Sequence, residues 1–220
     1  MRLYRILSVL LDYPEQDMLD ALPDITQALG SWPEARQSLK PLLEFLASCD
    51  LISAQENYVA TFDRNPAHAL YLFEHIHGES RDRGQAMVDL LEEYRRSGFD
   101  TRCSELPDHV PLFLEFLSLL DKDKAEPLLG EAIHVLSAIG DRLARNESPY
   151  SAAFLVLRSL TTVEPRLQAD PPVRDMDEAM EVFGAGIDGV EPLLRQPAMG
   201  EHTLRFHPRM NLCESQGKST

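Results

Sequence analysis

The chain has 220 residues, of which 44% are hydrophobic, and its formal net charge at pH 7 is −15. This length and apolar content suit one medium-sized domain with a substantial core. The negative charge disfavours a nucleic-acid-binding protein, which needs a cationic surface to neutralise phosphates.

The N-terminal residues predict a helix rather than a signal peptide. Apolar side chains recur at helical spacing from Leu3 to Leu11, and Pro14 stops the run without a small-residue cleavage site. No apolar run approaches the roughly 20 residues that span a bilayer. The three cysteines lie far apart, without metal-ligand or redox-motif spacing, as is typical of free thiols in a reducing compartment. We therefore expect a cytoplasmic protein without membrane insertion.

Helical spacing continues through the next four apolar runs, over residues 19–29, 39–46, 52–62 and 67–76. The last of these leads into a dense polar block at 72–84, which contains two histidines and five charged side chains. Such a block is costly to place against a core unless its groups are paired or meet a ligand. It therefore marks either a hydrogen-bonded hinge between helices or a recognition surface.

The second half of the chain predicts further helices. Ser80 is a candidate N-cap for a helix that ends near Gly98, and Asp108 is a candidate N-cap for the next helix. Apolar stripes then recur over residues 129–143 and 150–163. No stretch alternates like a strand for more than a few residues.

These patterns predict an all-α fold, with a single bundle-like domain of about seven to nine helices over residues 1–165. Beyond it the composition changes, because prolines punctuate a stretch in which seven acids face one arginine between residues 170 and 191. Residues 166–220 are expected to form an irregular, acidic and mobile tail, with at most one short helix around 176–183.

Histidines and carboxylates in the polar block raise the question of a metal site. His75 and His77 are spaced i, i+2, so on a helix they point to different faces. A turn could still gather them with Glu79 and Asp82 around zinc or iron. We predict no metal-binding and no catalytic residue. The alternative is a helical metal-dependent hydrolase that uses His75, His77, Glu79 and Asp108.

The neighbours Asp108 and His109 say little about catalysis, because an Asp that orients a His must be close in space rather than in sequence. A capping role for Asp108 is preferred. Arg81 and Arg83 could grip an anion, but no phosphate-binding motif surrounds them, so we expect them to pair with nearby acids. The residues expected to form this structural junction are Gly78, Ser80, Arg81 and Arg83.

Five aromatic residues have two interpretations that periodicity does not separate. They are core residues by default, or they line a groove for an amphipathic partner segment. The five are Tyr58, Phe62, Phe73, Phe113 and Phe116.

Three sequence blocks together resemble one protein family. They are Tyr58-Val59-Ala60-Thr61-Phe62-Asp63, the polar block with its continuation to Leu91, and Glu105-Leu106-Pro107-Asp108-His109. The opening Leu10-Leu11-Asp12-Tyr13-Pro14 is also similar to a motif of that family. The chain thus resembles the nitrate reductase molybdenum cofactor assembly chaperones, the NarJ or delta-subunit family within the wider molybdoenzyme maturation chaperones. The resemblance covers about residues 3–165.

The resemblance implies a non-catalytic cytoplasmic chaperone with an all-α fold and no cofactor of its own. Members of this family bind the apo catalytic (alpha) subunit of membrane-bound respiratory nitrate reductase, including its basic, amphipathic N-terminal segment. They allow insertion of the molybdenum cofactor and delay membrane docking until maturation is complete. Molybdenum cofactor biosynthesis proteins are a further class of partner that this role admits. An alternative client is another molybdoenzyme, exported with a full twin-arginine leader.

A client-binding surface that fits both the residues and the resemblance is an apolar groove, floored by aromatic side chains and rimmed by acids. Such a groove suits a basic amphipathic helix. Histidines in it would make binding depend on pH, because imidazole titrates near neutrality. The residues expected to bind the client are Tyr58, Phe62, Asp63, Phe73, Glu74, His75, His77, Glu79, Asp82, Glu105, Asp108, His109, Phe113 and Phe116.

Overall fold

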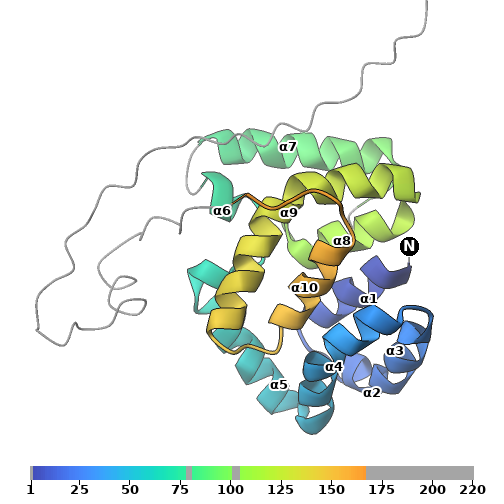
Figure 1. The fold of residues 1–220 in the computed structure, drawn as a ribbon. Coiled ribbons are helices and arrows are strands. Elements are labelled where there is room, and N and C mark those ends of the chain that lie inside the picture. The colour runs from blue at the N-terminus through green and yellow to red at the C-terminus, as the bar shows by residue number, and fades with distance from the viewer. Residues whose placement is uncertain (1, 78–80, 101–104, 167–220) are drawn as a thin grey trace, which may run out of the picture.

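The computed structural model describes residues 2–77, 81–100 and 105–166, and it confirms the all-α prediction (Figure 1). The α-helices of these ranges are α1 (Arg2–Leu11), α2 (Gln16–Asp20), α3 (Leu22–Ala28), α4 (Pro33–Ser48), α5 (Leu51–Tyr58), α6 (Glu74–His77), α7 (Arg81–Arg96), α8 (Val110–Leu119), α9 (Lys122–Arg145) and α10 (Ser151–Ser159). Three short helical turns accompany them: η1 (Leu29–Ser31), η2 (Val59–Asp63) and η3 (Pro66–His68).

The ten α-helices of the described ranges exceed the seven to nine expected, for two local reasons. The apolar run over 19–29 is divided at Ala21, which closes α2 and precedes α3. The polar block also contains a separate helix, α6, of only four residues. The apolar spacing of the sequence shows neither the division at Ala21 nor the separate helix α6, because the elements involved are short.

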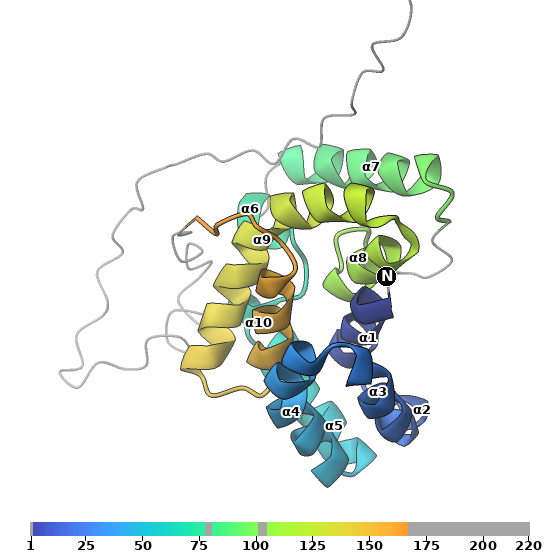
Figure 2. The same cartoon turned by 45° about the vertical axis from the view of Figure 1, so that its right-hand side comes forward.

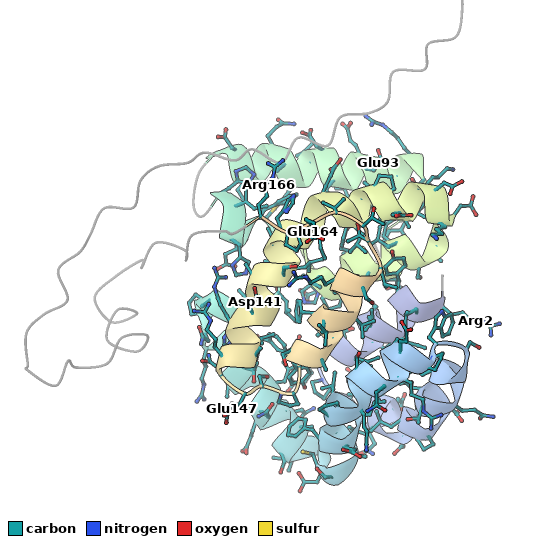
Figure 3. The ribbon with its side chains drawn as sticks, in the orientation of Figure 1. Arg2, Glu93, Asp141, Glu147, Glu164 and Arg166 are labelled. Atoms are coloured by element: carbon teal, nitrogen blue, oxygen red, sulfur yellow. The ribbon has the colours of Figure 1, made fainter. Side chains whose placement is uncertain are left out.

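The tail expected over 166–220 lies outside the described residues apart from Arg166. The segment that leads to Arg166 runs back across α9 (Figure 3), where the Arg166 backbone N–H donates to His134 Nδ1 at 3.0 Å. A Cβ placed on Gly130 would lie 2.9 Å from Val163 Cγ2, so glycine lets this segment approach α9 closely. Among the described helices, none is both long and apolar enough to cross a bilayer.

Helix α8 lies at the centre of the core. Seven of its residues are buried, on every side of the helix, which is the pattern of a core helix rather than of a surface one. It packs along α1, and the buried Ser8 hydroxyl donates to the Pro111 carbonyl at 2.8 Å. Helix α7 lies across one end of the molecule in both views (Figures 1 and 2) and inserts Tyr94, whose ring centroid is 4.4 Å from that of Phe116.

Helices α9 and α10 approach closely because Gly140 faces α10. A Cβ at Gly140 would lie 2.6 Å from the Cβ of Phe154, closer than real Cβ contacts come. Helix α10 packs against α4 on its other side. The residue before α10, Tyr150, is fully buried, and its ring lies 4.9 Å from that of Phe62.

A buried polar junction ties η3 to the end of α9. His68 Nδ1 donates to the Thr61 carbonyl at 3.0 Å, and His68 Nε2 accepts from Asn146 Nδ2 at 3.0 Å. This pairing requires the neutral imidazole, in agreement with burial, which lowers the pKa of His68. Arg142 donates to the Ala67 carbonyl at 3.3 Å. The junction therefore holds the chain just after η2 in a defined position.

Close contact at Gly140 gives a direct test of the core. We expect Gly140→Ala to destabilise the protein by about 1–2 kcal/mol, which is the cost of overpacking less the gain in helix propensity. The matched control is Gly84→Ala in α7, where a new Cβ meets nothing within 4 Å and should stabilise the protein by about 0.5–1 kcal/mol. Urea unfolding followed by circular dichroism measures both. A Gly140→Ala variant as stable as the unsubstituted protein would contradict the packing described.

Candidate functional site

The polar block and the Glu105–His109 block are joined by backbone hydrogen bonds. Tyr71 and His109 form an isolated antiparallel bridge. Leu72 N–H donates to the Asp108 carbonyl at 3.0 Å, and Val110 N–H donates to the Leu70 carbonyl at 2.8 Å. Two segments far apart in the sequence are thus held side by side at the start of α8.

The side chain of Asp108 strengthens this contact between residues 70–73 and the start of α8. Asp108 is fully buried, and its Oδ2 accepts from the Phe73 backbone N–H at 3.0 Å. Burial raises the pKa of Asp108, although the Phe73 N–H and the charge of Arg83 act in the opposite direction. The carboxyl therefore holds the turn before α6 rather than facing solvent.

Two predictions about Asp108 are corrected by this geometry. The N-cap residue of α8 is His109, which makes no side-chain cap bond, so Asp108 does not cap that helix. The reason is a turn before α8, in which His109 N–H donates to the Leu106 carbonyl at 3.0 Å. This turn directs the Asp108 side chain toward Phe73. Because Asp108 has no exposed surface, it does not face a client in this conformation either.

The two histidines of the polar block make different contacts. His75 Nε2 donates to the Ala69 carbonyl at 2.8 Å. The ring of His77 lies 5.9 Å from that of Phe73, and burial lowers the pKa of His77. Within the described ranges, no three His, Cys, Asp or Glu side chains are grouped so that they could hold a metal ion. Glu79, which the hydrolase alternative also requires, lies outside those ranges.

The residues predicted to form the structural junction between α6 and α7 are described only in part. Gly78 and Ser80 lie outside the described residues, and so do the predicted N-cap bond of Ser80 and the side chain of Arg81. Arg83 is half-buried, and its Nε has no hydrogen-bond partner among the residues that the structure places. Its charge acts to lower the pKa of both Asp108 and His77, so Arg83 lies near these two side chains. The pairing of Arg83 with an acid stays a prediction.

The five aromatic residues belong to the core, which is one of the two interpretations that the sequence left open. Phe73, Phe113 and Phe116 have no exposed surface, and Phe62 and Tyr58 are 4% and 5% exposed. They therefore do not floor an open groove in this structure, because other side chains cover them. Tyr58 has a structural role, since its hydroxyl donates to the Leu11 carbonyl at 3.1 Å and fixes the end of α1.

Three exposed carboxylates from separate segments act on His109 through their charges. Asp12 follows α1, Asp63 ends η2 and Glu105 precedes α8, and each of these charges acts to raise the pKa of His109. Burial is the larger effect, so the pKa of His109 lies below its ordinary value and the ring is neutral at neutral pH. Among the described residues, no Lys or Arg forms an ion pair with any of the three.

Tyr71 joins this group through its ring and its hydroxyl. Its ring centroid is 5.2 Å from that of His109, with 35° between the ring planes, and its hydroxyl donates to Glu105 Oε2 at 3.2 Å. Burial and the Glu105 carboxylate raise the pKa of Tyr71 to about 12, so the phenol keeps its proton. We call Asp12, Asp63, Tyr71, Glu105 and His109 the Tyr71–His109 face.

The structure thus brings together three of the predicted client-binding residues and adds two. Asp63, Glu105 and His109 were expected, whereas the sequence analysis did not single out Tyr71 or Asp12 as site residues. Asp12 lies in the Leu10–Pro14 block, but nothing in the spacing shows that it comes near residue 109. Exposed apolar side chains lie next to these residues in the sequence, with Tyr13 44% exposed and Leu106 41% exposed.

Two further acids that were predicted to bind the client lie on α6 and α7. Glu74 is half-buried on α6, and Asp82 is exposed in the first turn of α7. Neither is among the charges that shift the pKa of His109. Both have interactions of their own within the protein. They are therefore not part of the Tyr71–His109 face.

Comparison with known proteins identifies relatives over most of the chain. The family model of the nitrate reductase delta subunit matches residues 31–156. The Escherichia coli K12 protein named nitrate reductase molybdenum cofactor assembly chaperone NarJ is 40% identical over 190 residues, which cover 84% of this chain and 80% of that protein. The Bacillus subtilis protein named probable nitrate reductase molybdenum cofactor assembly chaperone NarJ is 32% identical over 157 residues, which cover 70% of this chain and 85% of that protein.

A solved structure shares the fold. The crystal structure of a redox enzyme maturation protein from Archaeoglobus fulgidus superposes with a TM-score of 0.55 at 22% sequence identity. The match covers 72% of this chain and 92% of that one. At this identity the likeness concerns the helical architecture alone.

The buried carboxyl of Asp108 gives a prediction about stability. Asp108→Ala removes the acceptor of the Phe73 N–H and leaves a buried donor unpaired, so we expect a loss of about 1–3 kcal/mol. Asp108→Asn keeps an oxygen acceptor and should lose clearly less. Urea unfolding of the two variants measures the difference, and an equal loss in both would contradict the role assigned to the hydrogen bond.

The same pair of variants has an expected pH dependence. Because the folded-state pKa of Asp108 is raised, its contribution to stability is full below the unfolded-state pKa and is lost as pH rises through the folded-state pKa. Asp108→Asn does not titrate. Its stability should therefore rise relative to the unsubstituted protein as pH increases over that window.

Proposed function

The chain belongs to the nitrate reductase delta subunit family, and on that premise we propose that it is a dedicated assembly chaperone for a respiratory nitrate reductase. It binds the apo catalytic subunit in the cytoplasm, and one contact is the subunit's basic, amphipathic N-terminal segment. Binding keeps the subunit open to insertion of the molybdenum cofactor and delays its docking to the membrane anchor. The chaperone acts by binding and has no reaction of its own. Relatives that are named as molybdenum cofactor assembly chaperones support this role.

The observation that carries the proposal is a set of three exposed carboxylates on the Tyr71–His109 face. Asp12, Asp63 and Glu105 come from three separate segments, and the charges of all three act on one buried histidine. Among the described residues no Lys or Arg pairs with them, and such carboxylates favour a cationic partner. A basic segment supplies that charge.

The apolar side of an amphipathic segment also finds a partner there. Tyr13 and Leu106 immediately follow Asp12 and Glu105 in the sequence, and both are substantially exposed. Exposed apolar side chains beside charged ones suit a helix that is basic on one face and apolar on the other. The support is thus chemical complementarity of two kinds at one place.

The alternatives are a helical hydrolase and a chaperone for an exported molybdoenzyme. The helical hydrolase has no support from the described residues, in which His75 and His77 do not converge with Asp108. A chaperone for an exported molybdoenzyme would use the same face for a twin-arginine leader. The binding experiment separates the two clients, because peptides from both can be compared on one protein.

Neutralising the face should weaken binding of the client segment. We expect the triple variant Asp12→Asn, Asp63→Asn, Glu105→Gln to bind a peptide of that segment about tenfold or more weakly, with each exposed carboxylate contributing about 0.5–1 kcal/mol. The matched control is Asp17→Asn, Asp24→Asn, Glu34→Gln, which removes the same charge from exposed acids on α2, α3 and α4. Calorimetry measures both affinities.

The salt dependence of the peptide affinity tests the role of charge in the same titration. Affinity of the unsubstituted protein should fall as salt is added, and the fall should be smaller for the neutralised face. Equal losses of affinity in the two triple variants would mean that net charge, rather than this face, attracts the peptide. A peptide that does not bind the unsubstituted protein would remove the N-terminal segment from the proposal.

Cofactor insertion is tested in nitrate-respiring cells that lack this protein. We expect the catalytic subunit purified from them to contain much less molybdenum than normal, because the apo subunit is not held open for insertion. The unsubstituted protein and the control triple variant should restore the metal content, and the neutralised face should restore less. Normal molybdenum content without the protein would contradict the proposed role.

A further inference from the structure

We propose that the Tyr71–His109 face recognises one arginine side chain of the bound segment and discriminates against lysine at that position. This inference rests on the proposed function, because it specifies which group of a basic client the face accepts. The observations that carry it are a buried histidine without a described hydrogen-bond partner, a tyrosine ring tilted against it, and three carboxylates that pair with no Lys or Arg of the described residues.

His109 is the unusual member of the group. Its side chain is 8% exposed, yet its ring nitrogens make no hydrogen bond to any residue that the structure describes. Neither ring nitrogen is among the buried polar atoms that lack a hydrogen-bond partner, so both are accessible to solvent. A neutral imidazole has one nitrogen that accepts a hydrogen bond. The face therefore presents an acceptor that nothing in the described chain uses.

Tyr71 supplies an aromatic surface next to this acceptor. Its ring is half-buried, so part of it remains open to solvent, and it is tilted by 35° on the His109 ring. The hydrogen bond from its hydroxyl to Glu105 holds the ring and the carboxylate in one arrangement. A cation over such a ring is attracted by the negative face of the π system.

The carboxylates complete a set of groups that suits a guanidinium. A guanidinium is flat, stacks on aromatic rings and donates several hydrogen bonds in a fixed fork, which suits a carboxylate and a neighbouring acceptor at the same time. Glu105 lies at one edge of the tyrosine, and the charges of Asp12 and Asp63 also reach His109. Lysine would satisfy the charge, but it has no plane to stack and no fork to bridge the acceptors.

Discrimination between the two cations is measured with peptides. The client segment is compared by calorimetry with versions in which its arginines are changed to lysine one at a time. We expect one position at which Arg→Lys weakens binding about tenfold, and smaller effects elsewhere, because net charge is unchanged in every peptide. Equal affinity of the unsubstituted and all-lysine peptides would overturn the inference while leaving the proposed function intact. Absence of binding by the unsubstituted peptide would instead count against the proposed function itself.

Variants of the protein test whether Tyr71 causes the discrimination between arginine and lysine. With Tyr71→Leu, the arginine and lysine peptides should bind alike, because the stacking surface is gone. Tyr71→Phe keeps the ring and should keep most of the discrimination. Leu155→Ala removes an exposed apolar side chain on α10, which is not part of the Tyr71–His109 face, and should preserve the difference in full. If Tyr71→Leu still discriminated as well as Leu155→Ala does, Tyr71 would not be the recognising ring.

A spectroscopic measurement covers the case in which Tyr71→Leu folds poorly. In the unsubstituted protein, nitrogen-15 NMR of the imidazoles should show a shift of the acceptor nitrogen of His109 on addition of the arginine peptide. The lysine peptide at saturation should give a clearly smaller shift. An unchanged His109 signal in the arginine complex would show that this nitrogen is not an acceptor for the client.

Discussion

The antiparallel bridge between Tyr71 and His109 is the contact on which the candidate site depends. Its backbone hydrogen bonds and the buried Asp108 carboxyl hold residues 70–73 against the start of α8. The packing of α8 on α1 then brings Asp12 near enough for its charge to act on His109. Three chain segments are in this way brought to one face. Loss of the bridge would separate Tyr71 from His109.

The protein places its charges unevenly with respect to this contact. Between residues 70–73 and the start of α8, burial raises the pKa of Asp108, and the carboxyl accepts a hydrogen bond from Phe73 N–H. Outside this contact, Asp12, Asp63 and Glu105 remain exposed, where water screens their mutual repulsion. A bound cation would relieve that repulsion and would gain a neutral acceptor at His109. Binding energy is thus available at the surface at little expense to the fold.

The helices could be predicted from the sequence because apolar side chains that share one helix face recur at a fixed spacing. The site could be predicted only in part. Asp108 precedes a helix, so it resembles a cap, and only the turn at Leu106–His109 shows that it faces Phe73 instead. The phenylalanines fit a core and a groove equally well until their burial is known. Proximity of Asp12 to His109 depends on how α1 packs on α8, which local spacing does not contain.

Site-specific photo-crosslinking in nitrate-respiring cells shows whether the client segment lies on the Tyr71–His109 face. A photoreactive residue at exposed Leu106, beside Glu105, is compared with one at exposed Leu155 on α10. We expect position 106 to crosslink to the N-terminal segment of the catalytic subunit and position 155 not to crosslink to it. Crosslinking of that segment from position 155, with none from position 106, would contradict its placement on this face.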